Sequence, residues 1–344
     1  MDDLLKKILD AAGVSGYEKE IAGIMQGELK KRCGNAEIDN FGNVIARKGK
    51  GAKKIMIAAH MDEIGLMVKG VTSDGYINFI KVGGIDDRIL PAQRVVVKSK
   101  KGDWLGVIGT KPPHLQKDEE RKHPIKYEDM FIDIGCKDKA EAARKVEIGD
   151  IIVFESNAGV LNGKLFYGKA LDNRIGCYAL LKIMEKVGAG AEVYAVATTQ
   201  EEVGLKGART SAFKIDPDFA IVIDTTIAGD TPQIKERESA LKLGRGVAIT
   251  IIEASGRGVI VSEKIKDMFI EIAKKDKIKY QIDVVEGGVT DGAIINMNRE
   301  GVPTGVLSIP TRYIHSPTGV FSLDDLNAAI ELAVKAVARI AKEK

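Results

Sequence analysis

The stretch AEVYAVATTQEEVG, from Ala191 to Gly204, joins a β-forming run to two adjacent acids. Val193 to Thr199 is rich in residues that favour strands, and Glu201 and Glu202 follow it directly. Burying an ionised carboxylate is costly unless a metal, another cation or a proton compensates its charge. In open α/β sheets, ligands bind outside the carboxyl ends of the strands. An acidic pair alone more often opens a solvated loop, so the rest of the chain must decide between a loop and a site.

The chain has the composition of an ordinary globular protein and a length that suggests two domains. It has 344 residues, of which 44% are hydrophobic and 29% charged, and a domain takes about 150 residues. The net charge of +3 comes from 52 basic and 49 acidic residues that are scattered along the chain. Because there is no basic tract, we do not expect nucleic acid as a partner.

The sequence also indicates where the protein acts. The N-terminus lacks the features of a signal peptide, and no apolar stretch reaches about 18 residues. We therefore expect neither secretion nor insertion into a membrane. The three cysteines, Cys33, Cys136 and Cys177, lie far apart without a CxxC pair. They fit reduced thiols better than disulfides or a thiolate metal site, which predicts a cytoplasmic protein.

Both ends of the chain have the pattern of an α/β domain. Continuous apolar runs such as Ile55 to Ala59 are typical of strands buried on both faces of a sheet. Other segments carry apolar residues at helical spacing. The predicted strands are 55–59, 191–199, 219–223, 247–252 and 304–309, with a hairpin at 36–39 and 44–47, and the predicted helices are 4–12, 17–32, 174–187, 261–274 and 323–342.

The middle of the chain is instead rich in short β-like runs, and only the segment 139–145 has helical character. A polar loop at 111–129 carries His114 and His123. Such a β-rich block is typical of a separate small domain or barrel. We therefore predict one α/β domain, formed by residues 1–67 together with 159–344, and a β-rich domain inserted at 68–158. The strands predicted in the insert are 76–80, 94–98, 104–108, 130–134 and 151–154.

Potential metal ligands follow several of these predicted strands. A single histidine after a strand is more often structural, and an aspartate before a helix is most often an N-cap. Their placement together at one edge of one sheet is much less expected by chance. The residues are His60 and Asp62 after strand 55–59, Asp172 before a helix, Glu201 and Glu202 after strand 191–199, Asp224 after strand 219–223, and His315 after strand 304–309.

This set of side chains favours metal-assisted hydrolysis. Two histidines and several carboxylates without a cysteine suit Zn²⁺ or Co²⁺. There are more ligands than one catalytic ion needs, so a pair of ions about 3.5–4 Å apart, bridged by one carboxylate, is the natural arrangement. Such a pair can polarise a carbonyl and lower the pKa of bound water. A remaining acid must then act as the base.

Five segments together resemble the metal-site motifs of the tetrahedral (TET) aminopeptidases, a family of dinuclear metallopeptidases. They are His60–Asp62, Gly168–Arg174, Thr199–Gly204, Val222–Asp224 and Tyr313–Ser316. The resemblance covers essentially the whole chain, including 111–114 and 131–135. It implies a mixed-sheet zinc-peptidase domain of the phosphorylase/hydrolase-like type. It also implies an inserted PDZ-like domain that forms dimers, and hollow tetrahedral dodecamers that admit peptides.

The resemblance also implies a role for each residue. His60 and Asp224 would hold one metal ion, Glu202 and His315 the other, and Asp172 would bridge the two. Glu201 would be the general base for the bridging water. Asp62 would orient His60, because residues two apart on an extended chain share a face. Cleavage at the N-terminal residue of a peptide follows from the resemblance alone.

The specificity pocket is less well defined by the sequence. Glycine-rich segments at 255–258 and 286–292 lack the spacing of a nucleotide-binding motif. They fit turns that bring the backbone close to a substrate, and purely structural turns fit nearly as well. Arg257, Thr290 and Asp291 in these segments are candidates for the pocket rim, and the preferred N-terminal residue is not predicted.

Two alternatives to an aminopeptidase remain open at this point. A carboxylate pair can also serve a glycoside hydrolase of the endoglucanase type. Its metal-free chemistry leaves the histidines unexplained, and the aromatic content of 5% with one tryptophan is low for sugar stacking. The other alternative is a non-catalytic particle that keeps metal for stability alone.

Overall fold

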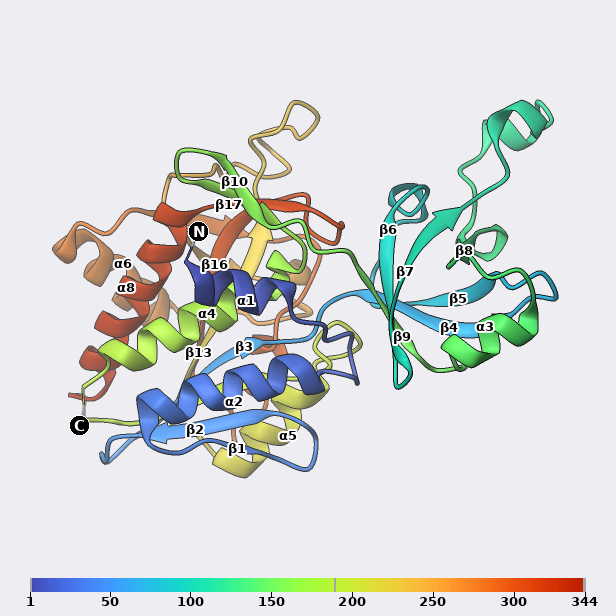
Figure 1. The fold of residues 1–344 in the computed structure, drawn as a ribbon. Helices are drawn as coiled ribbons and strands as arrows, with labels where there is room; N and C mark the ends of the chain where they lie inside the picture. Colours follow the sequence, from blue (N-terminus) through green and yellow to red (C-terminus); the bar gives the residue numbers. More distant parts are fainter. Residues whose placement is uncertain (1, 189, 343–344) are drawn as a thin grey trace.

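The computed structural model describes residues 2–188 and 190–342 of the chain. Two bodies are visible, a large α/β domain and a smaller β-barrel to its side (Figure 1). Within the described residues, no helix has the length and apolar character needed to cross a membrane. The strands before the barrel and those after it combine in one mixed sheet of eleven strands.

The centre of the sheet is parallel. Four strands lie side by side in the order β12 (Glu192–Thr198), β3 (Lys54–His60), β13 (Phe219–Ile227) and β16 (Thr304–Arg312). Because they are parallel, their carboxyl ends meet at one edge. Around them lie β1 (Glu37–Ile38), β2 (Val44–Lys48), β10 (Gly159–Asn162), β11 (Leu165–Gly168), β14 (Val247–Ile252), β15 (Tyr280–Val284) and β17 (Gly319–Ser322).

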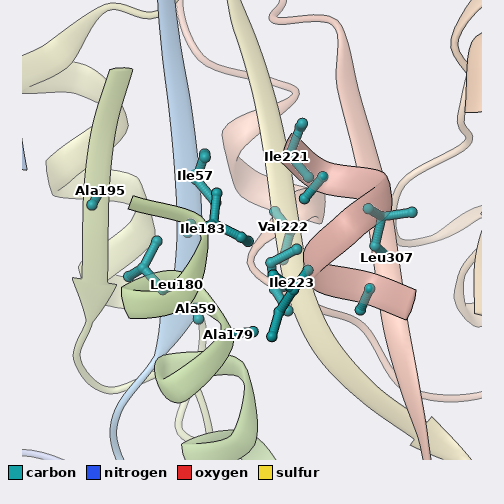
Figure 2. Close-up of a cluster of buried hydrophobic side chains, with 14 of the residues drawn as sticks. Ile57, Ala59, Ala179, Leu180, Ile183, Ala195, Ile221, Val222, Ile223 and Leu307 are labelled. Carbon is teal, nitrogen blue, oxygen red and sulfur yellow. The ribbon is translucent and has the colours of Figure 1, made fainter. Parts of the chain in front are cut away.

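Helices pack against the parallel strands, and the core lies between these helices and the sheet. Figure 2 shows Ala179, Leu180 and Ile183 of helix α4 packed against Ile57 of β3 and Ile223 of β13, all fully buried. Branched side chains fill such a two-sided strand well, which is why β3 is a continuous apolar run. The helices are α1 (Asp3–Asp10), α2 (Lys19–Cys33), α4 (Leu171–Lys186), α5 (Lys206–Ile215), α6 (Glu263–Asp276), α7 (Gly292–Ile295) and α8 (Leu323–Ile340).

The barrel is closed by antiparallel pairs in the order β4-β5-β8-β7-β6-β9. It encloses its own cluster of buried apolar side chains. Helix α3 (Lys139–Lys145) lies beside it, and the 111–129 loop extends away from it with three short 3₁₀ turns (Figure 1). Its strands are β4 (Gly65–Val71), β5 (Ile77–Val82), β6 (Arg94–Ser99), β7 (Gly102–Gly109), β8 (Phe131–Asp133) and β9 (Ile151–Phe154).

The mixed α/β architecture and all of the predicted strands and helices are confirmed, with shifts of up to a few residues at their ends. The sequence did not predict helices α5 and α7 and strands β4, β10, β11, β15 and β17. Most of these strands are half-exposed or short, so they lack the continuous apolar run that identifies a buried strand. The domain boundaries at 67/68 and 158/159 stay a prediction, close to barrel strands that run from Gly65 to Phe154.

Candidate metal centre

The carboxyl ends of the four parallel strands bring together the side chains predicted as metal ligands. The edge of a parallel sheet is where ligand sites form in α/β folds. The contributing residues are His60 at the end of β3, Glu201 and Glu202 in the turn between β12 and α5, Asp224 in β13, Asp172 at the start of α4, and His315 in the loop after β16.

Two clusters of ligand atoms meet at Asp172. In the first, His60 Nε2 lies 3.1 Å from Asp172 Oδ1 and 3.7 Å from Asp224 Oδ1. In the second, His315 Nε2 lies 3.5 Å from Asp172 Oδ2 and 3.4 Å from Glu202 Oε2. All ligand atoms within a cluster lie within 4.8 Å of one another, so each cluster could hold a metal ion. The two oxygens of Asp172 face different clusters, as those of a bridging carboxylate do.

Both histidines present Nε2 to a cluster and Nδ1 to an oxygen behind it. His315 Nδ1 lies 2.9 Å from the carbonyl oxygen of Gly84. A carbonyl oxygen only accepts, so this Nδ1 carries the proton and donates it. His60 Nδ1 lies 3.4 Å from Asp62 Oδ1. An imidazole that donates through one nitrogen offers the lone pair of the other, which is the form that binds metals.

Asp62 connects three parts of the site. Its Oδ1 accepts a hydrogen bond of 3.0 Å from the backbone N–H of Glu201, and its Oδ2 accepts one of 3.1 Å from that of Glu202. The same carboxylate faces His60, and it is fully buried. One side chain therefore fixes an imidazole and the turn that carries both glutamates. The sequence predicts the histidine contact but not the two amide contacts, because those depend on the path of the turn.

Crowding changes the proton affinities of these groups. Burial raises the pKa of Glu202 to about 8, and the charge of Asp172 adds to the shift. Burial also raises the pKa of Glu201 well above its ordinary value. A hydrogen bond to Asp172 raises the pKa of His315 to about 9, although burial of the ring opposes this. Protons thus compensate the buried charges in the metal-free protein, and a bound cation would displace them.

The donor atoms fit divalent cations. Imidazole nitrogens with carboxylate oxygens, and no thiolate, are the ligands that Zn²⁺ and Co²⁺ accept. Glu202 Oε1 is buried and has no hydrogen-bond partner among the described residues. A buried carboxylate oxygen without a donor is costly, and a cation beside it would remove that cost.

A cavity of about 1070 Å³ opens directly onto the two clusters. On its wall, Asp283 Oδ2 accepts hydrogen bonds from Thr226 Oγ1 at 2.7 Å and from Thr250 Oγ1 at 3.4 Å. Glu253 Oε1 accepts one from Thr290 Oγ1 at 2.6 Å. Burial raises the pKa of both carboxyl groups. No lysine or arginine of the described chain lines the cavity, so its wall is acidic even beyond the two clusters.

The three residues predicted for the pocket rim lie in different places. Thr290 lines the cavity. Asp291 is buried behind it and accepts a hydrogen bond from Thr198. Arg257 is exposed, and its Nε donates to the carbonyl of Ala254. Asp283 was not predicted as a cavity residue, although an acid inside the β-like run YQIDV is a usable signal.

The geometry agrees with a family of known proteins. Residues 42–332 match the family described as M42 glutamyl aminopeptidase. The chain belongs to this family. It is therefore a peptidase of the aminopeptidase class, and its family implies divalent metal ions, for which the two clusters at Asp172 are the candidate sites.

Similar proteins support the same assignment. Lysyl aminopeptidase of Pyrococcus furiosus is 37% identical, over 96% of this chain and 95% of that protein. The structure of a TET aminopeptidase from a marine sediment thaumarchaeon has a TM-score of 0.95 and 38% identity, and the match covers 98% of this chain and 96% of that one. TET1 peptidase of Pyrococcus horikoshii, described as able to assemble into a tetrahedron or a large octahedral shell, has a TM-score of 0.87, 37% identity and 98% coverage of both chains.

Glycoside hydrolysis is not favoured. A similar structure from Thermotoga maritima is named as an endoglucanase, with a TM-score of 0.80, 33% identity, and coverage of 98% of this chain and 99% of that one. The matched family and the relatives above are aminopeptidases, however. The two histidines that face the acids also have no role in a metal-free glycosidase.

Asp172 is the residue that belongs to both clusters. Replacing it therefore tests whether the clusters form one shared two-ion site or two independent sites. We expect Asp172→Ala to lose both metal ions, and His315→Ala to keep about one ion per chain, bound by His60 and Asp224. Metal analysis of the dialysed proteins by mass spectrometry measures this. His114→Ala, an exposed histidine of the barrel loop, is the control and should keep two ions. Two ions retained in Asp172→Ala would contradict the bridge.

Proposed function

We propose that this protein removes N-terminal residues from peptides at a centre of two divalent metal ions, zinc or cobalt. The observation that carries the proposal is the position of Asp172, with one oxygen toward each cluster. His60 and Asp224 would hold one ion, and Glu202 and His315 the other. When bound, such a pair polarises the scissile carbonyl and lowers the pKa of water. Two independent sites that each bind one ion would not need a shared carboxylate.

Glu201 is the acid left over for proton transfer. Its Oε2 lies 3.9 Å from His60 Nε2, at the side of the first cluster, and it is absent from both ligand sets. Burial raises its pKa, which suits a group that must hold a proton during the reaction. Glu201 would take the proton from the attacking water and pass it to the leaving amine. Asp62 would hold the turn so that Glu201 faces the substrate while Glu202 faces the metal.

Replacing Glu201 by glutamine tests this division of roles. The side chain keeps its size, and the ligands are unchanged, so Glu201→Gln should retain both ions while kcat falls by about 10²- to 10⁴-fold. Metal analysis and steady-state kinetics on the same sample measure both quantities. Loss of metal in this variant would make Glu201 a ligand, and wild-type turnover would remove it from the chemistry.

The cavity would receive the side chain of the N-terminal residue. Its acidic wall and its lack of lysine and arginine favour neutral or basic side chains over acidic ones. Two like charges in contact cost several kcal/mol. We therefore propose that glutamyl and aspartyl peptides are poor substrates, even though the matched family is described by a glutamyl activity.

A panel of aminoacyl anilides tests both the activity and this preference. We expect release of leucine and lysine with a kcat/KM at least about tenfold above that for glutamate. Chelation should abolish the activity, and added zinc or cobalt should restore it. A cellulose derivative serves as the control for the glycosidase alternative. If the metal-loaded protein cleaves no anilide or short peptide, the proposed aminopeptidase activity is wrong. If it cleaves them but prefers glutamate, only the proposed selectivity is wrong.

We further propose that the barrel is the PDZ-like dimerisation domain of a tetrahedral dodecamer, with boundaries at 68 and 158. The similar TET1 peptidase, which is described as able to assemble into a tetrahedron or a large octahedral shell, supports this. So do Leu105 and Val107, which are 51% and 45% exposed on strand β7 of the barrel. The three free cysteines support a cytoplasmic location.

Light scattering coupled to size exclusion tests the assembly. We expect a particle of twelve chains for the wild type. Changing Leu105 and Val107 to aspartate should lower the mass, because buried charges are costly at an apolar contact. A monomeric wild type across micromolar concentrations would contradict self-association, and an unchanged mass in the double variant would remove β7 from the interface.

A further inference from the structure

The loop that joins α1 to α2, residues 11–18, touches the metal centre without supplying a ligand. We call it the α1–α2 loop. Ser15 Oγ donates a hydrogen bond of 2.6 Å to Asp62 Oδ2, and both side chains are buried. Farther along the loop, Glu18 Oε1 accepts the backbone N–H of Gln200 at 3.0 Å. The loop therefore reaches the ends of both β3 and β12.

Ser15 holds Asp62, the carboxylate that contacts both His60 and the turn with the two glutamates. Asp62 faces His60 and accepts the amides of Glu201 and Glu202. The terminal torsion of an aspartate is broad, so its carboxylate plane must be set by its partners. The Ser15 hydroxyl is the partner that comes from outside the parallel strands. It completes four contacts around one carboxylate and leaves that group a single orientation.

Glu18 supports the turn that follows β12. Gln200 has a φ of +54°, a conformation that costs free energy for a residue with a side chain. Glu18 is buried, and the same Oε1 also accepts the N–H of Gly16 at 2.7 Å. This carboxylate fixes Gln200 next to Glu201. The direction in which the two glutamates leave the turn is thus set in part from the α1–α2 loop.

A buried ion network fixes the loop itself. Lys169 Nζ lies 2.9 Å and 2.7 Å from the two oxygens of Glu63, and Gly13 N–H donates to the same carboxylate at 3.1 Å. Arg174 Nη1 donates to the carbonyl of Ala11 at 2.9 Å, and its Nη2 lies 3.3 Å from Glu63. Glu63 directly follows Asp62, and Lys169 and Arg174 stand on either side of Asp172 along the chain. The network ties the loop to both segments.

We infer that Ser15 and Glu18 are positioning residues for the metal centre: Ser15 acts through Asp62, and Glu18 acts through the turn at Gln200. The inference rests on the proposed two-metal function of the same site. Neither side chain lines the cavity, so substrate affinity should depend little on them. The positions of the metal ligands and of Glu201 should depend on them strongly. Loss of such supporting contacts costs about 10- to 100-fold in metal affinity or activity.

Ser15→Ala is the direct test in the full-length, metal-loaded protein. We expect metal affinity or kcat to fall by about 10- to 100-fold, with KM changed less than twofold. The visible absorption bands of the cobalt-loaded protein should shift, because they report ligand geometry. Ser211→Ala is the matched control. Ser211 is also buried, but its hydroxyl donates to Gly207 within its own helix, and its removal should change none of these readouts.

Glu18 gives a second, independent pair of variants if Ser15→Ala does not fold. Glu18→Gln keeps an oxygen that can accept the Gln200 amide, so it should resemble the wild type, whereas Glu18→Ala should lose affinity or kcat like Ser15→Ala. The inference is overturned if Ser15→Ala, or Glu18→Ala where only that pair folds, binds cobalt with wild-type affinity, spectrum and kcat. It is also overturned if the alanine and glutamine variants at position 18 behave alike. A wild type that binds two cobalt ions but cleaves no peptide would refute the proposed function alone, because the affinity and the spectrum still test the positioning.

Discussion

Burial of carboxyl groups at the end of a parallel sheet is the constraint on which the rest of this structure depends. Asp172, Asp224, Glu201 and Glu202 lie close together with little access to water. Burial raises the pKa of most of them, whereas hydrogen bonds and charge from the two histidines lower that of Asp172 against the effect of its own burial. A fold gains nothing in stability from such an arrangement unless cations enter it. The arrangement is therefore best understood as a binding site that the surrounding elements hold in place.

Most of the candidate site could be predicted from where the parallel strands end. Parallel strands end at one edge, so the polar residues that follow the predicted strands 55–59, 191–199 and 219–223 had to lie near each other. The ligand chemistry then limited the metal, and the order of the motifs identified the family. Asp172 was the exception, because an aspartate before a helix is usually an N-cap and only the resemblance gave it a bridging role. The structure brings it to His60 and His315 from outside the parallel strands.

Other features could not be predicted from local patterns. Strand β4 begins with glycine and ends half-exposed, so its sequence has neither alternation nor a long apolar run. Asp283 and Glu253 line the cavity because β14 pairs with β16 and β15 pairs with β14. The acid within the run YQIDV can be seen in the sequence, but the long-range strand pairing that brings it to the cavity cannot. Asp291 lies next to Thr290 in sequence, yet one is buried behind the wall and the other lines it. The contacts of the α1–α2 loop join residues about 50 to 180 positions apart and were likewise invisible.

The barrel also contributes a contact to the candidate metal centre. Its first strand, β4, begins at Gly65, three residues after Asp62, and Gly84 lies in the segment after strand β5. The carbonyl of Gly84 accepts a hydrogen bond from His315 Nδ1, and this contact selects the tautomer that leaves a lone pair on Nε2, the nitrogen on the side of Asp172 and Glu202. The second cluster therefore requires the barrel segment to be in register with the α/β domain. If the barrel also joined two chains, the geometry of the second cluster would depend on assembly. Any movement of the barrel would move the carbonyl oxygen that orients His315.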